Sequence, residues 1–132
     1  MIFQIDIPIY NSNVLMLIEP TQEEFDELLS DENNHNKLTD EELKNIFEEL
    51  DGPYMGYTNK LSNGGQIMLL KDASKPIYYV HELFHVANNI LQGCGVTLDE
   101  DGEAYAYLVG WLVDQYYNVV VLGVRNKEEA DE

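Results

Sequence analysis

The sequence predicts an α+β fold, in which a small, mostly antiparallel sheet of about four strands accompanies two long helices. In the first half, short segments alternate apolar and polar residues, which is the period of β-strands. In the second half, two long segments repeat apolar residues at the spacing of helices. A chain of 132 residues suits one domain, which we place at residues 1–126, and we expect the acidic end, 127–132, to be disordered.

Four segments of the first half predict strands: residues 3–9, 14–19, 54–58 and 66–70. Pro8 lies within the first segment and suits the edge of a sheet, because it cannot donate a ladder hydrogen bond. Pro20 ends the second segment. A turn that contains Gly64 and Gly65 joins the last two segments into a hairpin.

Two short helices are predicted between these strands. Thr21 and Glu24 stand three residues apart, which is the spacing of a capping box at a helix start. Thr39 and Glu42 repeat this signature and open the second helix. The polar segment 30–37 between them predicts a loop.

The second half predicts two long helices. Ser74 is expected to cap the first, with Pro76 in its first turn, where the missing N–H costs no hydrogen bond. One stripe of this helix is expected to face the core: Ile77, Val80, Phe84, Ala87 and Leu91. The second helix begins near Asp101 and is apolar almost all round, which predicts a buried position.

Residues 81–85, HELFH, carry the candidate chemistry. His81 and His85 share one helix face and can direct ring nitrogens at one ion, at the distance of about 2.0–2.1 Å that zinc requires. Glu82 is offset by one residue, where it can accept a proton from water without binding the metal. The alternative is a structural role, in which the two histidines form hydrogen bonds at the edge of a core.

A catalytic zinc site needs a third protein ligand. The acidic run at residues 99–103 holds the candidates. Asp99 and Asp101 precede the last helix and suit its cap and its positive end. Glu103 lies in the first turn of that helix, and Gly110 would let the His-bearing helix approach closely. We therefore predict Glu103 as the third ligand, with Asp99 as the competitor.

The segments HELFH and GEAYAYLVGWLVD resemble the zincin metallopeptidases, and among them the gluzincins, in which a glutamate on the next helix is the third ligand. The resemblance is closest to small zincin-like proteins of phages and prophages and covers residues 66 to 116. It implies a zincin-like fold, zinc bound by His81, His85 and Glu103, and peptide-bond hydrolysis with Glu82 as general base.

The chain also departs from the gluzincins. Seventeen residues, 86 to 102, separate His85 from Glu103, slightly fewer than in the larger members. The large second subdomain of those enzymes, which helps to form specificity pockets, is absent. These departures leave an alternative function, that of a catalytically inactive structural, accessory or regulatory phage protein.

Charge limits the class of partner. The chain has 25 acidic and 7 basic residues, so its formal charge of −18 repels nucleic acids and anionic membranes and attracts cations and basic peptides. We expect a peptide or protein substrate of basic character.

Asp114 and Gln115 interrupt the longest apolar segment, 104–124, which argues against a membrane span. A single cysteine, Cys94, and an N-terminal segment unlike a secretory leader predict a cytoplasmic location, in the host bacterium if a phage encodes the chain.

Overall fold

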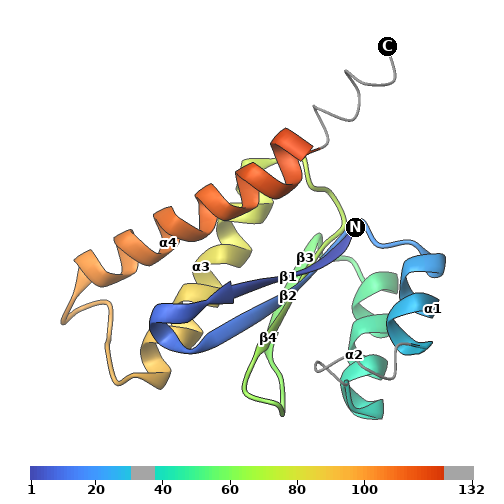
Figure 1. The fold of residues 1–132 in the computed structure, drawn as a ribbon, viewed down its shortest axis with the longest axis horizontal. Coiled ribbons are helices and arrows are strands. Elements are labelled where there is room, and N and C mark those ends of the chain that lie inside the picture. Colours follow the sequence, from blue (N-terminus) through green and yellow to red (C-terminus); the bar gives the residue numbers. More distant parts are fainter. Residues whose placement is uncertain (31–37, 124–132) are drawn as a thin grey trace. The chain divides into compact units, whose positions relative to one another are not determined.

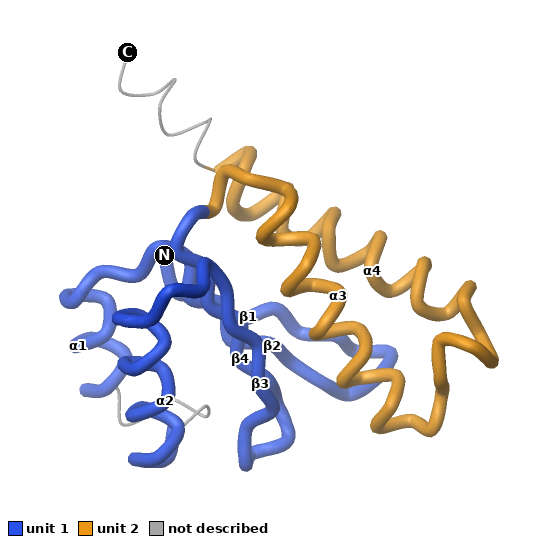
Figure 2. The backbone as a smooth tube through the Cα atoms, turned by 180° about the vertical axis from the view of Figure 1, so that it is seen from behind, with its two compact units in different colours: residues 1–72 blue, residues 73–132 orange. Residues whose placement is uncertain are grey.

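The structure of the protein is a computed structural model that describes residues 1–30 and 38–123. The acidic end and nearly all of the predicted polar loop lie outside these residues. The chain divides into two compact units, residues 1–72 and 73–132, which Figure 2 shows in blue and orange. The expectation of a single domain stays a prediction.

Unit 1 contains a four-stranded sheet (Figure 1). Its strands are β1 (Ile2–Ile7), β2 (Ser12–Ile18), β3 (Gly56–Lys60) and β4 (Gln66–Leu70). Their order across the sheet is β1-β2-β4-β3; β2 and β4 run parallel, and the two outer pairs are antiparallel. The predicted α+β class and the small, mostly antiparallel sheet are therefore confirmed.

Three predicted strands have wrong bounds. β2 runs from Ser12 to Ile18 and not over residues 14–19, because its ladder with β1 extends back to Ser12 and the chain leaves the sheet at Glu19, which has a φ of 45°. β1 ends at Ile7, because Pro8 begins a short 3-10 helix, Pro8–Tyr10, where its fixed φ takes the chain out of the ladder. β3 begins at Gly56 and not at residue 54, because the antiparallel register pairs Gly56 with Leu70, the last residue of β4. The fourth strand, by contrast, has the predicted bounds.

Two helices lie together on one side of the sheet in Figure 1: α1 (Gln22–Ser30) and α2 (Asp40–Asp51). Both predicted capping boxes are present. The Thr39 hydroxyl accepts a hydrogen bond from the Glu42 amide, and the Glu42 side chain accepts one from the Thr39 amide. Thr21 and Glu24 form the same two hydrogen bonds at the start of α1. Side chains from both helices and the sheet form one core: Leu15, Leu17, Phe25, Ile46, Leu61, Ile67 and Leu69.

Unit 2 consists of α3 (Pro76–Gly93) and α4 (Gly102–Tyr116), with α4 continued by a π-helical segment, Tyr117–Val121. The two helices are antiparallel. The ring of Tyr79, near the start of α3, stacks on Tyr116 at the end of α4, with ring centroids 4.4 Å apart. The Tyr116 hydroxyl also donates to the carbonyl of Ala73 at 2.9 Å. Stacking and hydrogen bond together hold the end of α4 against the start of α3.

The predicted cap of α3 is wrong. Lys75, not Ser74, occupies the N-cap position, and its side chain makes no capping hydrogen bond. Pro76 takes the first helical position, as predicted. Because proline has no N–H to satisfy and a φ suited to the helix, this start depends less on a side-chain cap.

The predicted buried stripe of α3 is wrong in its first half. Ile77 is 73% exposed, and Val80 and Phe84 are exposed as well. The buried residues of α3 are Glu82, Leu83, Val86, Ala87, Ile90 and Leu91. Apolar residues occupy two overlapping faces of this helix, and its period alone does not select the one that packs.

The predicted all-round burial of α4 is also wrong. Only one stripe is buried: Tyr105, Leu108, Leu112 and Tyr116. Tyr107, on another face, is 82% exposed. Gly110 is exposed, and a Cβ placed there would meet nothing within 4 Å, so it does not serve a close approach of α3. In the part of the chain that the structure describes, no helix has the length and apolar character of a membrane span.

Candidate metal centre

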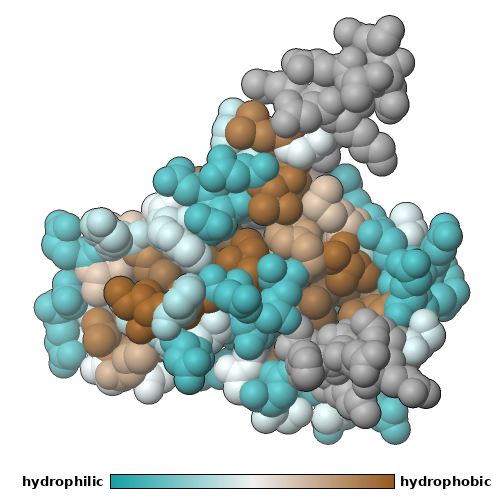
Figure 3. Space-filling view, in the orientation of Figure 1, coloured by the Kyte–Doolittle hydropathy of each residue, from teal (hydrophilic) through white to brown (hydrophobic). Residues whose placement is uncertain are grey.

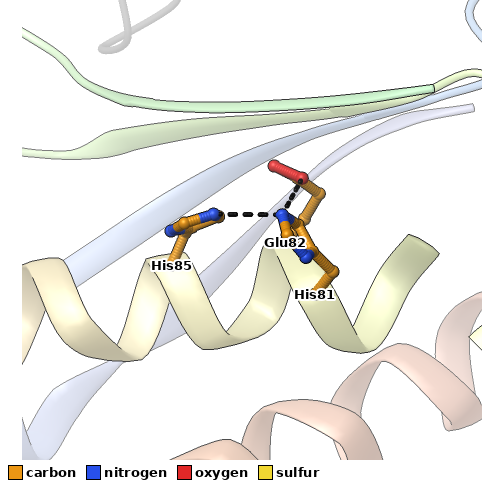
Figure 4. Close-up of side chains that lie close together, drawn as sticks. All are labelled: His81, Glu82 and His85. Atoms are coloured by element: carbon orange, nitrogen blue, oxygen red, sulfur yellow. Dashed lines mark hydrogen bonds and ion pairs between the residues drawn. The ribbon is translucent and has the colours of Figure 1, made fainter. Parts of the chain in front are cut away.

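The second and third turns of α3 bring together His81, Glu82 and His85 (Figure 4). α3 is regular from Pro76 to Gly93, so residues one turn apart lie on the same face. Both histidines are exposed, and their rings point toward one another in Figure 4. The predicted pairing of the two imidazoles is therefore present in the structure.

The two Nε2 atoms lie 3.2 Å apart, and the ring planes meet at 78°. Two ligand nitrogens at zinc distances on a tetrahedral ion are about 3.3 Å apart, so the rings already have the required separation. The same distance also suits a hydrogen bond between one protonated and one unprotonated nitrogen. The pair thus fits both a metal site and a neutral histidine pair.

Glu82 lies beside the pair but on an adjacent face, about 100° around the helix. Its Oε2 is 3.9 Å from His81 Nε2, and the ligand atoms of the three residues all lie within 4.8 Å of one another. Glu82 is only 5% exposed, and it is the one buried acidic residue among the described residues. A carboxylate and two imidazoles are side chains of the kinds that ligate zinc.

Contacts from α4 fix the turn of α3 that carries His85. The ring of Tyr105 lies 6.1 Å from that of Phe84, which in turn lies 6.5 Å from the His85 ring. The Tyr105 hydroxyl donates to Asn88 Oδ1 at 3.0 Å. No sequence motif indicates Asn88, although its spacing of seven residues from His81 places both residues on one helix face.

The acidic run before and within α4 lies apart from this group. Asp101 caps α4, as predicted, by accepting a hydrogen bond from the Ala104 amide at 3.1 Å. Glu103 is exposed and stands two residues, or about 200°, from Tyr105, which faces α3. Neither Glu103 nor Asp99 belongs to the ligand group found among the described residues. The third ligand therefore stays a prediction.

No family model, curated protein or solved structure matches this chain. The resemblance to zincins rests on the segments HELFH and GEAYAYLVGWLVD alone.

Proposed function

We propose that this chain is a zinc-dependent peptidase in which His81 and His85 bind the metal and Glu82 is the general base. The observation that carries the proposal is the 3.2 Å separation of two imidazole nitrogens beside a buried carboxylate. Imidazole ligands suit zinc, whereas calcium and magnesium prefer oxygen. The substrate is a peptide or protein, and the charge of −18 favours basic character.

Each side chain has a distinct part in this chemistry. Zinc, when bound, supplies a Lewis acid that polarises a carbonyl and lowers the pKa of water. His81 and His85 would hold the ion on the exposed face of α3. Glu82 accepts a proton from the attacking water and passes it to the leaving amine, which needs an ionised carboxylate at a fixed position. Burial of Glu82 restricts its side chain to the edge of the histidine pair.

A metal analysis combined with a peptide-library cleavage assay tests the enzyme activity. Glu82→Gln keeps the shape of the side chain and removes the proton acceptor. We expect it to lower the cleavage rate by about three orders of magnitude or more and to leave the melting curve unchanged. Cleavage that persists in Glu82→Gln, or its absence in zinc-loaded wild type, would contradict the proposal.

A second function is favoured by the compactness of the ligand group. Three ligand atoms lie within 4.8 Å, and Glu103 is exposed outside the group. If Glu82 itself binds the metal, no base remains, and the chain is a non-catalytic zinc protein with an accessory or regulatory role. His81, His85 and Glu82 would then be the complete set of protein ligands.

Two carboxylates separate these functions. For the peptidase we expect Glu103→Gln to weaken zinc binding at least about tenfold and Glu82→Gln to leave it nearly unchanged. For the non-catalytic protein we expect Glu82→Gln to weaken zinc binding at least about tenfold and Glu103→Gln to leave it nearly unchanged. Glu100→Gln and Asp101→Asn are the controls, since changing a cap costs about 1 kcal/mol of helix stability and removes no metal bond. A large effect of Asp99→Asn would transfer the third ligand to that residue.

A further inference from the structure

Asn88 lies on the face of α3 that carries the two histidines. It follows His81 by seven residues and His85 by three, so it stands within about 60° of both around the helix axis. The Cβ atoms of residues three apart on a helix are about 5–6 Å from each other. Asn88 is half-buried, so part of the residue is accessible to solvent.

Tyr105 orients the Asn88 amide. The Tyr105 side chain is only 2% exposed, and its hydroxyl lies 3.0 Å from Asn88 Oδ1 and 3.2 Å from the carbonyl of Val96. A hydroxyl has one proton, and the nearer acceptor is Oδ1. With Oδ1 held by Tyr105, the NH2 group of Asn88 is the part of the amide that stays available as a donor. Within the described residues, no protein acceptor is found for it.

We propose that Asn88 is a substrate-binding residue of the His81/His85 site, whose NH2 group donates a hydrogen bond to a backbone carbonyl of the bound peptide. The inference rests on the proposed function, because the peptide must first occupy the metal centre. Asn88 touches the substrate directly, whereas Tyr105 is a positioning residue that acts through the amide oxygen. A peptide carbonyl has the required chemistry, since it accepts hydrogen bonds and recurs at every residue whatever the side chain.

Two zinc-binding probes isolate this contact. Acetohydroxamate binds the metal and has no peptide bond, whereas acetyl-trialanine hydroxamate adds peptide carbonyls to the same metal-binding group. Their affinities for zinc-loaded full-length protein are measured by calorimetry. We expect Asn88→Ala to weaken the trialanine probe about fivefold and to leave acetohydroxamate and zinc affinity unchanged, since one neutral hydrogen bond is lost.

Asn88→Asp and Tyr105→Phe refine the test. Asp retains an acceptor for the Tyr105 hydroxyl and has no NH2 group, so it should lose at least as much trialanine affinity as alanine does. Tyr105→Phe frees the amide to rotate and should give a smaller loss. Gln92→Ala is the matched control, because Gln92 is an exposed amide one turn further along the same face.

The outcomes distinguish the inference from the function it rests on. Equal affinity of wild type and Asn88→Ala for the trialanine probe would overturn the role of Asn88 while zinc binding stands. Undiminished binding by Asn88→Asp would show that the amide oxygen, not the NH2 group, faces the peptide, which also overturns the proposed donor. Failure of wild type to bind zinc overturns the proposed function and the inference with it.

Discussion

The histidine pair depends on the spacing of two residues on one helix. His81 and His85 hold their Nε2 atoms 3.2 Å apart while both side chains are exposed. Exposed rings gain little from burial, so a hydrogen bond between the two nitrogens or a shared ion would have to hold them in this arrangement. Asn88 lies on the same face as the pair, and Glu82 lies on the adjacent face, so single substitutions in these turns of α3 act directly on the candidate site.

We therefore expect wild type to carry one zinc ion per chain after purification without a chelator, and His81→Ala or His85→Ala to lose it. Metal analysis gives the stoichiometry. Because an ion that binds only the folded state stabilises it, added zinc should raise the melting temperature of wild type but not of His81→Ala or His85→Ala. His35→Ala is the matched control and should retain the ion. Stoichiometric zinc in the His81→Ala/His85→Ala double variant would rule out the site.

At the scale of the elements, Glu42 joins the start of α2 to the β3–β4 hairpin. Its carboxylate accepts hydrogen bonds from the Thr39 amide at 2.9 Å and from the Ser62 amide at 3.1 Å. Partial burial alone would raise the pKa of Glu42, but these hydrogen bonds outweigh it and bring the pKa below the ordinary value of 4.5. The ionised form is thus the one that stabilises the folded state.

This direction sets the pH dependence of stability. A folded-state pKa below the unfolded value gives a contribution that is fully present above the unfolded pKa and is lost as the pH falls through the folded pKa. Acidification below about pH 4.5 should therefore lower the free energy of unfolding more in wild type than in Glu42→Gln. Urea unfolding at pH 7, 5, 4 and 3 measures both curves, and parallel curves would contradict the role of Glu42.

The hairpin turn depends on a glycine for steric reasons. A Cβ on Gly65 would lie 2.4 Å from Asn13 Oδ1, which is itself buried and without a hydrogen-bond partner in the described structure. Gly65→Ala should therefore destabilise the protein by about 1–3 kcal/mol. Asn13→Ala in the same chain should recover part of the loss, which a double-mutant cycle in urea measures.

Gly110→Ala is the control for this substitution. Gly110 lies within α4 in open space, so alanine there should stabilise the helix by about 0.5–1 kcal/mol. If the changes that Gly65→Ala and Asn13→Ala cause in the free energy of unfolding are additive, the methyl group added by Gly65→Ala and the Asn13 side chain do not collide.

At the scale of the whole molecule, the acidic surface determines which ligands approach. The helices α1 and α2 together carry ten carboxylates and one lysine, a formal charge of −9 and half of the −18 of the chain. Figure 3 shows hydrophilic side chains over α1. A surface of this sign attracts cationic ligands over a distance that salt shortens to about 10 Å at 0.1 M.

Peptides with Lys or Arg near the cleaved bond should accordingly have the higher kcat/KM, and the advantage should shrink as salt rises from about 0.02 to 0.5 M. A matched neutral peptide is the control and should change little with salt. A preference for basic residues that is insensitive to salt would place its cause in local contacts and not in the net charge.

The sequence by itself determined the features that depend on neighbours within one or two turns. The capping boxes at Thr21 and Thr39, the bounds of β4 and the pairing of His81 with His85 were all predicted correctly. Each rests on the fixed geometry of residues two to four apart, which the order of the chain specifies directly.

Only the tertiary structure decided which faces pack. Ile77 was predicted to be buried and is exposed, while Glu82 is buried beside the histidines; α4 buries one stripe and exposes Tyr107 and Gly110. The same packing turns Tyr105 toward Asn88 and leaves Glu103 on the exposed side. The physical reason is that apolar faces of these helices overlap in sequence, so the buried face is selected by contacts with residues distant along the chain.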